Sequence, residues 1–584
     1  LTKADVLQNI RDKVPVKINY SQIGLIPSRR DFLDAKLKAA FETQISKGAP
    51  VLFMGNTVLD RHDYVAGTMT YFPYLFGVLP CGTKVTVVLT GVDVEFDIGV
   101  PAGMTPTTYD SLLRGQLAAR GINYLSITDQ LFYPLHGFYT EKQPYKRIKF
   151  SNLNDRKAAI MFIREQNSER KLKGLPLLQT ASNDCGANNY YFSKVAREHR
   201  FAPAGWNRLT EYTYARGTGT TEFVLTVDVK NFKRLTSAQI ADYSRPGHAL
   251  ESVISRDPLI NCGWDIETFN TVQDGIIPTR ACKTFNIFMI CDAFSFHHCM
   301  DPMLTVCCVV VETNARPGND LTIICGNEHN VLEAHMKVLA AMTTDILIAF
   351  NGGKFDWPLY LEKCRRENLL CQLRNCLSAI PDKRNDESAV LKWNFKKESV
   401  KIDAESNHDL DVVAQFPGIL DTDALPIFLG MYSKAETGKA SSLNYFLARN
   451  GLESKEDMPY KKMFKLYERA LSIGHIKSCH CGDAQHVCGI CTQVVPQIDC
   501  KPVRDLGDGE FMYGTELHDS LLRDGKPLCC YCGKKAKSAA DMAQVGYYCT
   551  VDSIRPHQLF VRRIIVQDRR TISNMAYVSL YDAF

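Results

Sequence analysis

The chain has 584 residues, of which 45% are hydrophobic and 23% are charged, and its formal net charge is +5 at pH 7. This composition is typical of a globular protein and argues against a disordered or fibrous one, and the length predicts two to four domains. The small positive charge permits a nucleic-acid partner without arguing for one. The most apolar run, MLTVCCVVV at 303–311, is shorter than the roughly 20 residues of a membrane helix, so no membrane span is expected.

The first 250 residues alternate helical patterns with strand-like runs. Strand patterns begin at Val51, Tyr71 and Lys84, and Gly and Pro turns separate them. This pattern predicts a mixed α+β domain with a small sheet over residues 1–250. No catalytic combination of residues stands out in it, so it is interpreted as scaffold.

From about residue 255, strands are followed by helices, as in an α/β sheet. The first of these strands carries Asp265 and Glu267 in the sequence NCGWDIETFN. Alternate residues of a strand point to the same face, so this pair directs two hard oxygen ligands at one point. In isolation such a pair is more often a solvated strand end than a metal site.

Two further carboxylates follow at positions suited to ligand binding. A buried strand (ILIAF) and a Gly-Gly turn precede Asp356, which begins a helix just beyond the carboxyl end of that strand. Residues 541–566 predict one long helix, bent at its proline, on which Tyr548 and Asp552 share a face. The simpler interpretations are a helix-end charge for Asp356 and a solvated surface pair for the other two.

A cysteine-rich stretch precedes that last helix. Its two C-x-x-C pairs offer four thiolates at the spacing of a structural Zn²⁺ site, and reduced surface thiols are disfavoured because they would invite oxidation. The preferred ligands are Cys488, Cys491, Cys529 and Cys532. In the alternative arrangement, Cys479 and Cys481 join the first pair and leave the rest for a second ion. The zinc is assigned to folding or docking.

The motifs DIET, NGGKFD and Y-x-x-x-D, in this order, resemble the three exonuclease motifs of the family B DNA polymerases. The runs around them, TDILIAFNGGKFDWPLYLEKC and SSLNYFLARNGLESKEDMPYKKMFKLY, are also similar to that family. In the second run, Lys455 stands where the residue order of that family leads us to expect it. The resemblance covers residues from about 215 to 584 well and the N-terminal part only by its position and its many strands, and the family members that the chain resembles are of the large DNA virus type.

The resemblance implies a ribonuclease H-like exonuclease domain with two Mg²⁺ or Mn²⁺ ions. The ions activate the attacking water and stabilise the leaving 3′ oxygen. It implies that Tyr548 orients the water, and that Asn351 and Phe355 hold the terminal nucleotide, Phe355 by stacking. The implied metal ligands are Asp265, Glu267, Asp356 and Asp552. Asp265 is expected to bridge both ions.

The motifs of the polymerase palm are not found in this sequence. The resemblance therefore implies the proofreading 3′-5′ exonuclease portion of a DNA-directed DNA polymerase, which releases nucleoside monophosphates.

The expected domains are an N-terminal α+β domain at 1–250, the exonuclease domain at 251–474 and 536–570, a zinc-binding insertion at 475–535, and the start of a link to the palm at 571–584. Since the chain begins with leucine and ends without a cap or tail, we expect a piece of a longer protein.

The implied partners are a DNA 3′ end, the remaining palm, fingers and thumb, and a processivity factor as a further candidate. The 21 cysteines and the polar start of the chain favour a reducing, intracellular location, in the nucleus or cytoplasm, at a viral replication site if the source is a virus.

Two alternatives to the function of a polymerase exonuclease remain. One is a free-standing exonuclease with the same carboxylates and tyrosine, acting on DNA or RNA. The other is a non-catalytic, zinc-bearing nucleic-acid-binding module.

Overall fold

The computed structural model describes two compact units. The described residues are 1–134, 137–175, 177–178, 191–254, 256–270, 278, 282, 284–438, 441–455, 457–474 and 530–584, with six short strands between 486 and 527. The first unit contains Leu1–Leu33 and Pro258–Val566, and the second contains Asp34–Asp257 and Gln567–Phe584. The domain boundaries expected from the sequence place the two chain ends differently, and that domain assignment stays a prediction.

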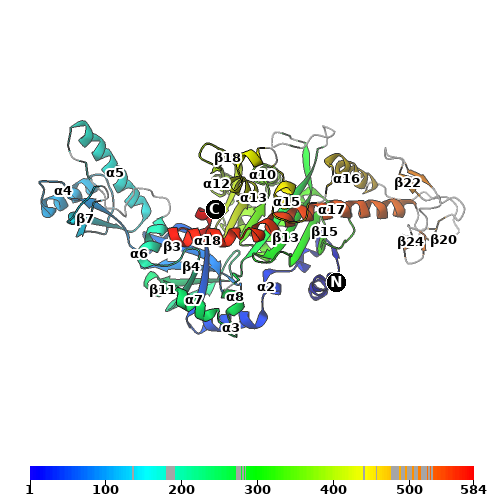
Figure 1. The fold of residues 1–584 in the computed structure, drawn as a ribbon, viewed down its shortest axis with the longest axis horizontal. Coiled ribbons are helices and arrows are strands. Elements are labelled where there is room, and N and C mark those ends of the chain that lie inside the picture. Colours follow the sequence, from blue (N-terminus) through cyan, green and yellow to red (C-terminus); the bar gives the residue numbers. More distant parts are fainter. Residues whose placement is uncertain are drawn as a thin grey trace. The chain divides into compact units, whose positions relative to one another are not determined.

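The described residues of the first unit form a nine-stranded mixed sheet in the order β1-β15-β14-β13-β12-β16-β19-β18-β17 (Figure 1). The central strand β12 (Ile260–Asn270) is antiparallel to β13 (Phe285–Phe296) and parallel to β16 (Ile346–Ala349). The other strands are β1 (Val16–Asn19), β14 (Leu304–Val309), β15 (Leu321–Ile324), β17 (Phe395–Lys401), β18 (Asn407–Phe416) and β19 (Ile419–Asp423). The mixed α/β fold expected from residue 255 onward is confirmed.

The first 33 residues complete this unit. β1 pairs in parallel with β15, and Arg29 Nη1 forms a buried ion pair with Asp345 Oδ2 at 2.8 Å. The N-terminal helical elements of the unit are α1 (Lys3–Arg11), η1 (Tyr20–Leu25) and α2 (Arg29–Phe32). A strand pairing between residues this distant in sequence leaves no local sequence signal.

Strands β12 to β16 are buried on both faces, which explains why they show no alternation of buried and exposed residues, whereas the edge strand β17 is mostly exposed. On β14, Leu304, Val306 and Cys308 enter one hydrophobic core, and Cys307 and Val309 enter the other. Helices line both cores. They are α9 (Glu328–Met342), α10 (Asp356–Arg366) and α11 (Leu370–Leu377) on the first, and α16 (Tyr460–Gly474) and α17 (Cys530–Arg562) on the second.

The predicted long helix is present as α17, which continues through Pro556 and runs across the sheet (Figure 1). Its backbone touches β12 directly, because a Cβ placed on Gly263 would lie 1.9 Å from the Ser553 carbonyl oxygen. Ser553 Oγ also donates to the Cys291 carbonyl at 2.9 Å. These contacts fix how α17 lies on the sheet.

The remaining elements of the first unit lie between or beyond these helices. The helices are α12 (Glu387–Asn394), α13 (Ala424–Met431), α14 (Lys434–Thr437) and α15 (Leu443–Arg449). The short strands pair two by two and are β20 (His486–Val487), β21 (Val494–Val495), β22 (Val503–Asp505), β23 (Phe511–Tyr513), β24 (Leu522–Arg523) and β25 (Lys526–Pro527).

The second unit is also a mixture of helices and sheets, as expected, but its main sheet is larger than the small one predicted. Within the described residues it has seven strands, in the order β11-β8-β2-β3-β4-β10-β9, beside a three-stranded sheet β5-β7-β6. The predicted strands at Val51, Tyr71 and Lys84 lie in β2, β3 and β4. The sheet is enlarged by strands from 206–234, which pair with β2 and β4 across a wide gap in sequence.

The strands of the second unit are β2 (Val51–Val65), β3 (Thr68–Val78), β4 (Lys84–Thr90), β5 (Val94–Gly99), β6 (Ser126–Phe132), β7 (Gln143–Phe150), β8 (Trp206–Leu209), β9 (Tyr212–Arg216), β10 (Phe223–Asp228) and β11 (Phe232–Arg234). Its helical elements are α3 (Ala35–Ser46), α4 (Pro106–Ala119), α5 (Leu153–Leu172), α6 (Tyr191–His199), η2 (Val229–Asn231), α7 (Ser237–Tyr243), α8 (Glu251–Ile254), α18 (Ile565–Ala576) and α19 (Leu580–Ala583), of which α18 begins in the first unit. No helix in the described parts of the chain is long and apolar enough to span a membrane.

Substituting Gly263→Ala should destabilise the first unit, because the new methyl group would overlap the Ser553 carbonyl and push α17 off the sheet. Overpacking of this kind lowers the free energy of unfolding by about 3 kcal/mol. Thermal and urea unfolding followed by circular dichroism measure the effect. Gly24→Ala is the matched control, since a Cβ there meets no atom within 4 Å. Equal stability of the two variants would contradict the close packing.

Candidate active site

The carboxylates predicted on the first strand face α17. On β12, Trp264 and Ile266 enter the core on one side of the sheet, so Asp265 and Glu267 point to the other side. Glu267 is buried with 7% exposure, and Asp265 is partly buried. The register with β13 shifts directly after Glu267. The pair therefore lies at an irregular point of the sheet, where a strand can redirect its side chains.

The third and fourth carboxylates come from two helices. Asp356 is the first residue of α10 and is 2% exposed, and its carboxylate accepts a hydrogen bond from the main-chain N–H of Ile266. Asp552 lies on α17, beside the close contact with β12. Among the described residues, neither Asp356 Oδ1 nor Asp552 Oδ1 has a hydrogen-bond partner, although both atoms are buried. Oxygen atoms left in this state are suited to a hard divalent cation.

In this cluster the four carboxyl groups outnumber the nearby cations. Burial, followed by the charges of Asp356, Glu267 and Asp552, raises the pKa of Asp265 well above its ordinary value. Burial also raises the pKa of Glu267 well above its ordinary value, and that of Asp356 to about 7. Without a cation, such a cluster retains protons at neutral pH. A divalent ion would remove both the repulsion and the need for those protons.

Tyr548 is held beside the cluster by Lys455. Lys455 Nζ lies 2.8 Å from Asp552 Oδ2 and donates a hydrogen bond to Tyr548 Oη at 3.3 Å. Burial and the charge of Asp552 raise the pKa of Tyr548, so the phenol keeps its proton. Burial alone would lower the pKa of Lys455, but the negative charges of Asp552 and the other carboxylates raise it by a larger amount. The pKa therefore lies above its ordinary value, and the ammonium stays charged.

Sequence reasoning included Lys455 in a matching segment but assigned it no role. The residue lies between α15 and α16, and its main-chain N–H donates to Asn444 Oδ1 at 2.8 Å, which fixes the loop. A single lysine in a loop follows no periodic pattern. The sequence signal was the position of Lys455 after Asn444, in the order expected for the segment that resembles the family.

The turn that carries Asn351 is anchored by another residue that sequence reasoning missed. Asp423 ends β19 and accepts the main-chain N–H groups of Asn351 at 2.8 Å, Gly353 at 3.0 Å and Leu425 at 3.0 Å. Asn351 has a φ of +64°, so the turn needs this support. Phe355 follows in the same turn, directly before Asp356. The turn thus places Asn351 and Phe355 at the edge of the cluster, and their role with a nucleotide stays a prediction.

A buried thiol also lies at the cluster. The ligand atoms of Asp265, Glu267 and Cys549 are all within 4.8 Å of one another, whereas Asp356 and Asp552 fall outside that spacing. Cys549 Sγ donates to Asp265 Oδ2 at 3.7 Å, and burial raises its pKa well above the ordinary value. The thiol is therefore a neutral neighbour, and the carboxylates remain the candidate ligands of a divalent ion.

The predicted zinc ligands are not tested by the structure. Cys479, Cys481, Cys488, Cys491 and Cys529 lie outside the described residues. Cys532 falls in the first turn of α17, but its side chain is outside the described part of the structure. The zinc site stays a prediction.

The metal-free protein should become less stable as the pH rises from about 4 to about 7. In this window the unfolded Asp356, with a pKa near 3.8, has lost the proton that the folded Asp356, with a pKa of about 7, still holds. Asp356→Asn should therefore raise the melting temperature in EDTA at pH 8 by several degrees and raise it by less at pH 5. Mn²⁺ should stabilise the parent chain at pH 8 more than this variant.

Scanning fluorimetry with EDTA or Mn²⁺ measures both effects. Asp411→Asn, on the exposed side of β18, is the control for a simple change of net charge. A variant Asp356→Asn that melts below the parent in EDTA at pH 8 would contradict the repulsion within the cluster.

Comparison with known proteins identifies relatives. Residues 186–414 match the family model described as "DNA polymerase family B, exonuclease domain". The chain is 26% identical to proteins named "DNA polymerase beta" of African swine fever virus, over 91% of this chain. It covers 36% of the protein of isolate Pig/Kenya/KEN-50/1950 and 34% of that of isolate Pig/Portugal/Lis 60/1960. The chain thus spans about a third of the length of these curated relatives.

A solved family B DNA polymerase from the hyperthermophilic archaeon Pyrobaculum calidifontis is similar with a TM-score of 0.42 and 13% identity. The match covers 71% of this chain and 42% of that one. The family-model match includes Asp265, Glu267 and Asp356 and ends before Tyr548 and Asp552.

Proposed function

Because the chain carries an exonuclease domain of the family B DNA polymerases, we propose that it is the proofreading 3′-5′ exonuclease portion of a DNA-directed DNA polymerase. The observation that supports this most is a group of four carboxylates from one strand and two helices, whose pKa values are raised chiefly by burial. Glu267 and Asp356 are buried, and Asp265 and Asp552 are partly buried. The proposed substrate is a single-stranded DNA 3′ end. The proposed product is a nucleoside monophosphate.

In the proposed mechanism Asp265, Glu267, Asp356 and Asp552 would hold two Mg²⁺ or Mn²⁺ ions. When bound, these ions lower the pKa of the attacking water and stabilise the leaving 3′ oxygen. The water oxygen would then form a bond to phosphorus as the bond between phosphorus and the 3′ oxygen breaks. The water would give up one proton and the leaving 3′ oxygen would take one up, so one water is consumed for each nucleoside monophosphate released.

The chain's own side chains would orient the reactants. Tyr548 keeps its proton and orients the water through its hydroxyl, because Lys455 Nζ holds that hydroxyl beside Asp552. Asn351 and Phe355 would hold the terminal nucleotide, on a turn that Asp423 fixes. We also propose that the domain has the ribonuclease H-like arrangement.

The proposed partners follow from the size of the relatives. Since the chain spans about a third of their length, we propose that palm, fingers and thumb elements act together with it. A processivity factor is a further proposed partner. The proposed location is the nucleus or cytoplasm, at a viral replication site.

Incubation of a 5′-labelled single strand with the purified chain and Mg²⁺ or Mn²⁺ tests the activity. The expected result is a ladder shortened from the 3′ end. Asp265→Ala with Glu267→Ala should lower the rate roughly 10³-fold or more, because the two carboxylates act as one electrostatic unit. The exposed pair Asp411→Ala with Glu405→Ala is the matched control. An unchanged strand with the folded parent chain, or full activity of the double variant, contradicts the proposal.

The same assay with an RNA strand distinguishes the alternatives. Equal shortening of RNA and DNA favours a free-standing exonuclease. Binding without shortening of either strand favours a non-catalytic nucleic-acid-binding module.

We propose one structural Zn²⁺ ion held by Cys488, Cys491, Cys529 and Cys532. Elemental analysis of the purified chain should find about one zinc per chain, and Cys488→Ser with Cys491→Ser should remove it. Cys479→Ser with Cys481→Ser separates the two arrangements, since zinc is retained in the preferred one and lost in the alternative. A parent chain purified without zinc, in a form that does not bind added zinc, contradicts both.

A further inference from the structure

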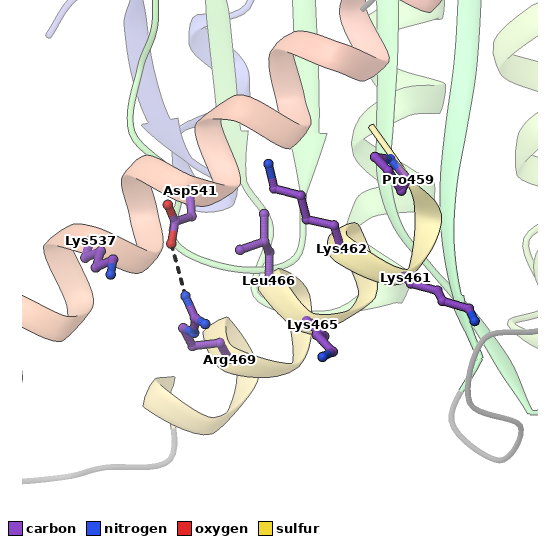
Figure 2. A pocket seen from close by; sticks show the side chains of 8 residues that line it. All are labelled: Pro459, Lys461, Lys462, Lys465, Leu466, Arg469, Lys537 and Asp541. Carbon is purple, nitrogen blue, oxygen red and sulfur yellow. Dashed lines mark hydrogen bonds and ion pairs between the residues drawn. The ribbon is translucent and has the colours of Figure 1, made fainter. Parts of the chain in front are cut away.

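A basic groove of about 620 Å³ lies between α16 and α17, outside the carboxylate cluster (Figure 2). Its charged lining residues are Lys461, Lys462, Lys465, Arg469, Lys537 and Asp541. The lining therefore carries five cations and one carboxylate. In Figure 2, Lys462 is directed into the space between the two helices, and Arg469 is directed at Asp541. Arg469 Nη1 and Asp541 Oδ2 are 3.4 Å apart.

The fold does not need these charges for packing. α16 buries Met463, Phe464 and Tyr467 against α17 and the sheet, and its lysines occupy the other positions of the helix. Lys461, Lys462 and Lys465 are exposed, and their ammonium groups have no carboxylate partner among the described residues. A cluster of unneutralised cations in a concave site raises the local positive potential and attracts anions.

The groove lies on the same stripe of α17 as the proposed catalytic residues. Lys537, Asp541, Tyr548 and Asp552 are spaced by 4, 7 and 4 residues, which places them on one helix face. At a rise of 1.5 Å per residue, Asp541 and Lys537 precede Tyr548 by about 10 and 16 Å along the axis. On the α16 side, the segment that brings Lys455 to Asp552 continues six residues later into Lys461. The cations therefore extend away from the cluster along two elements.

We propose that this basic groove binds the phosphate backbone of the single strand whose 3′ end enters the carboxylate cluster, at phosphates a few nucleotides from the scissile one. The inference rests on the proposed function and names a binding site in addition to the cluster. Cations spread along two facing helices match a series of phosphates, and lysine contacts to phosphate position a strand without reading its sequence. An acidic protein segment is the competing occupant and is an outcome of the test.

The test variant is Lys462→Glu with Lys465→Glu in the full chain. Its matched control is Lys157→Glu with Lys171→Glu, two exposed lysines of α5. Binding of a fluorescein-labelled 20-nucleotide oligo(dT) is measured in EDTA by anisotropy, so that no cleavage occurs. We expect the Kd to rise about tenfold or more. The slope of log K against log salt should fall by about 1.4, which corresponds to two lost phosphate contacts on a single strand.

A cleavage assay distinguishes a wrong groove proposal from a wrong exonuclease proposal. With Mg²⁺, the variant should lose about tenfold in kcat/KM on the 20-nucleotide strand and stay within about twofold of the parent on a dinucleotide, which is too short to reach the groove. Lys462→Gln with Lys465→Gln should show a smaller loss in the same direction. Circular dichroism and thermal unfolding verify that each variant is folded.

Unchanged oligo(dT) affinity and unchanged salt slope in the folded variant overturn the groove proposal. The same holds if poly-glutamate binds the parent more tightly than oligo(dT) does at equal salt, which assigns the surface to an acidic protein. If the parent binds oligo(dT) but cleaves neither substrate, and the lysine variant binds oligo(dT) more weakly, the groove proposal is supported and the exonuclease proposal is overturned.

Discussion

The direct contact between the backbone of α17 and strand β12 is the constraint on which the candidate site depends. Gly263 has no Cβ, so the Ser553 carbonyl lies where a methyl group would otherwise be. Asp265 and Glu267 follow Gly263 on the strand, and Asp552 precedes Ser553 on the helix. Carboxylates nearly 300 residues apart in sequence therefore meet because two backbones meet. A wider separation of helix and sheet would leave the carboxylates too far apart to share a cation.

The same closeness is electrostatically unfavourable, because four carboxylates in a poorly solvated site repel one another and raise one another's pKa values. Lys455 is the one charged amine that the described structure brings to Asp552, and it offsets only part of that repulsion. The rest of unit 1 compensates with apolar burial on both faces of its sheet. A site of this kind is held together by its surroundings and gains stability from the cation that it binds.

The strands and helices of the first unit follow from local patterns, whereas the members of the cluster were joined into one site by the resemblance to the family B DNA polymerases. Apolar runs indicate strands buried on both faces, D-x-E on a strand directs two carboxylates to one side, and a four-residue spacing pairs Tyr548 with Asp552. What the sequence did not predict depends on partners distant in the chain. In the sequence, nothing distinguishes Asp423 from other residues at a strand end. Only the structure shows that it accepts hydrogen bonds from three main-chain N–H groups. The seven-stranded sheet was underestimated because its strands from 206–234 pair with strands before residue 91.

If the groove binds DNA as proposed, the carboxylate cluster and the basic groove between α16 and α17 have different tasks. At the carboxylate cluster Lys455 is the one amine beside Asp552 in the described structure, so the cluster offers a phosphate little attraction until a divalent cation is bound. Two to three helical turns earlier, the lysines of the basic groove make the field positive. Attraction to that groove does not require a bound cation, because its charges belong to the protein. In that proposal a DNA strand is held at a distance from the cluster while the reaction itself depends on the divalent cation, so binding and cleavage are separable.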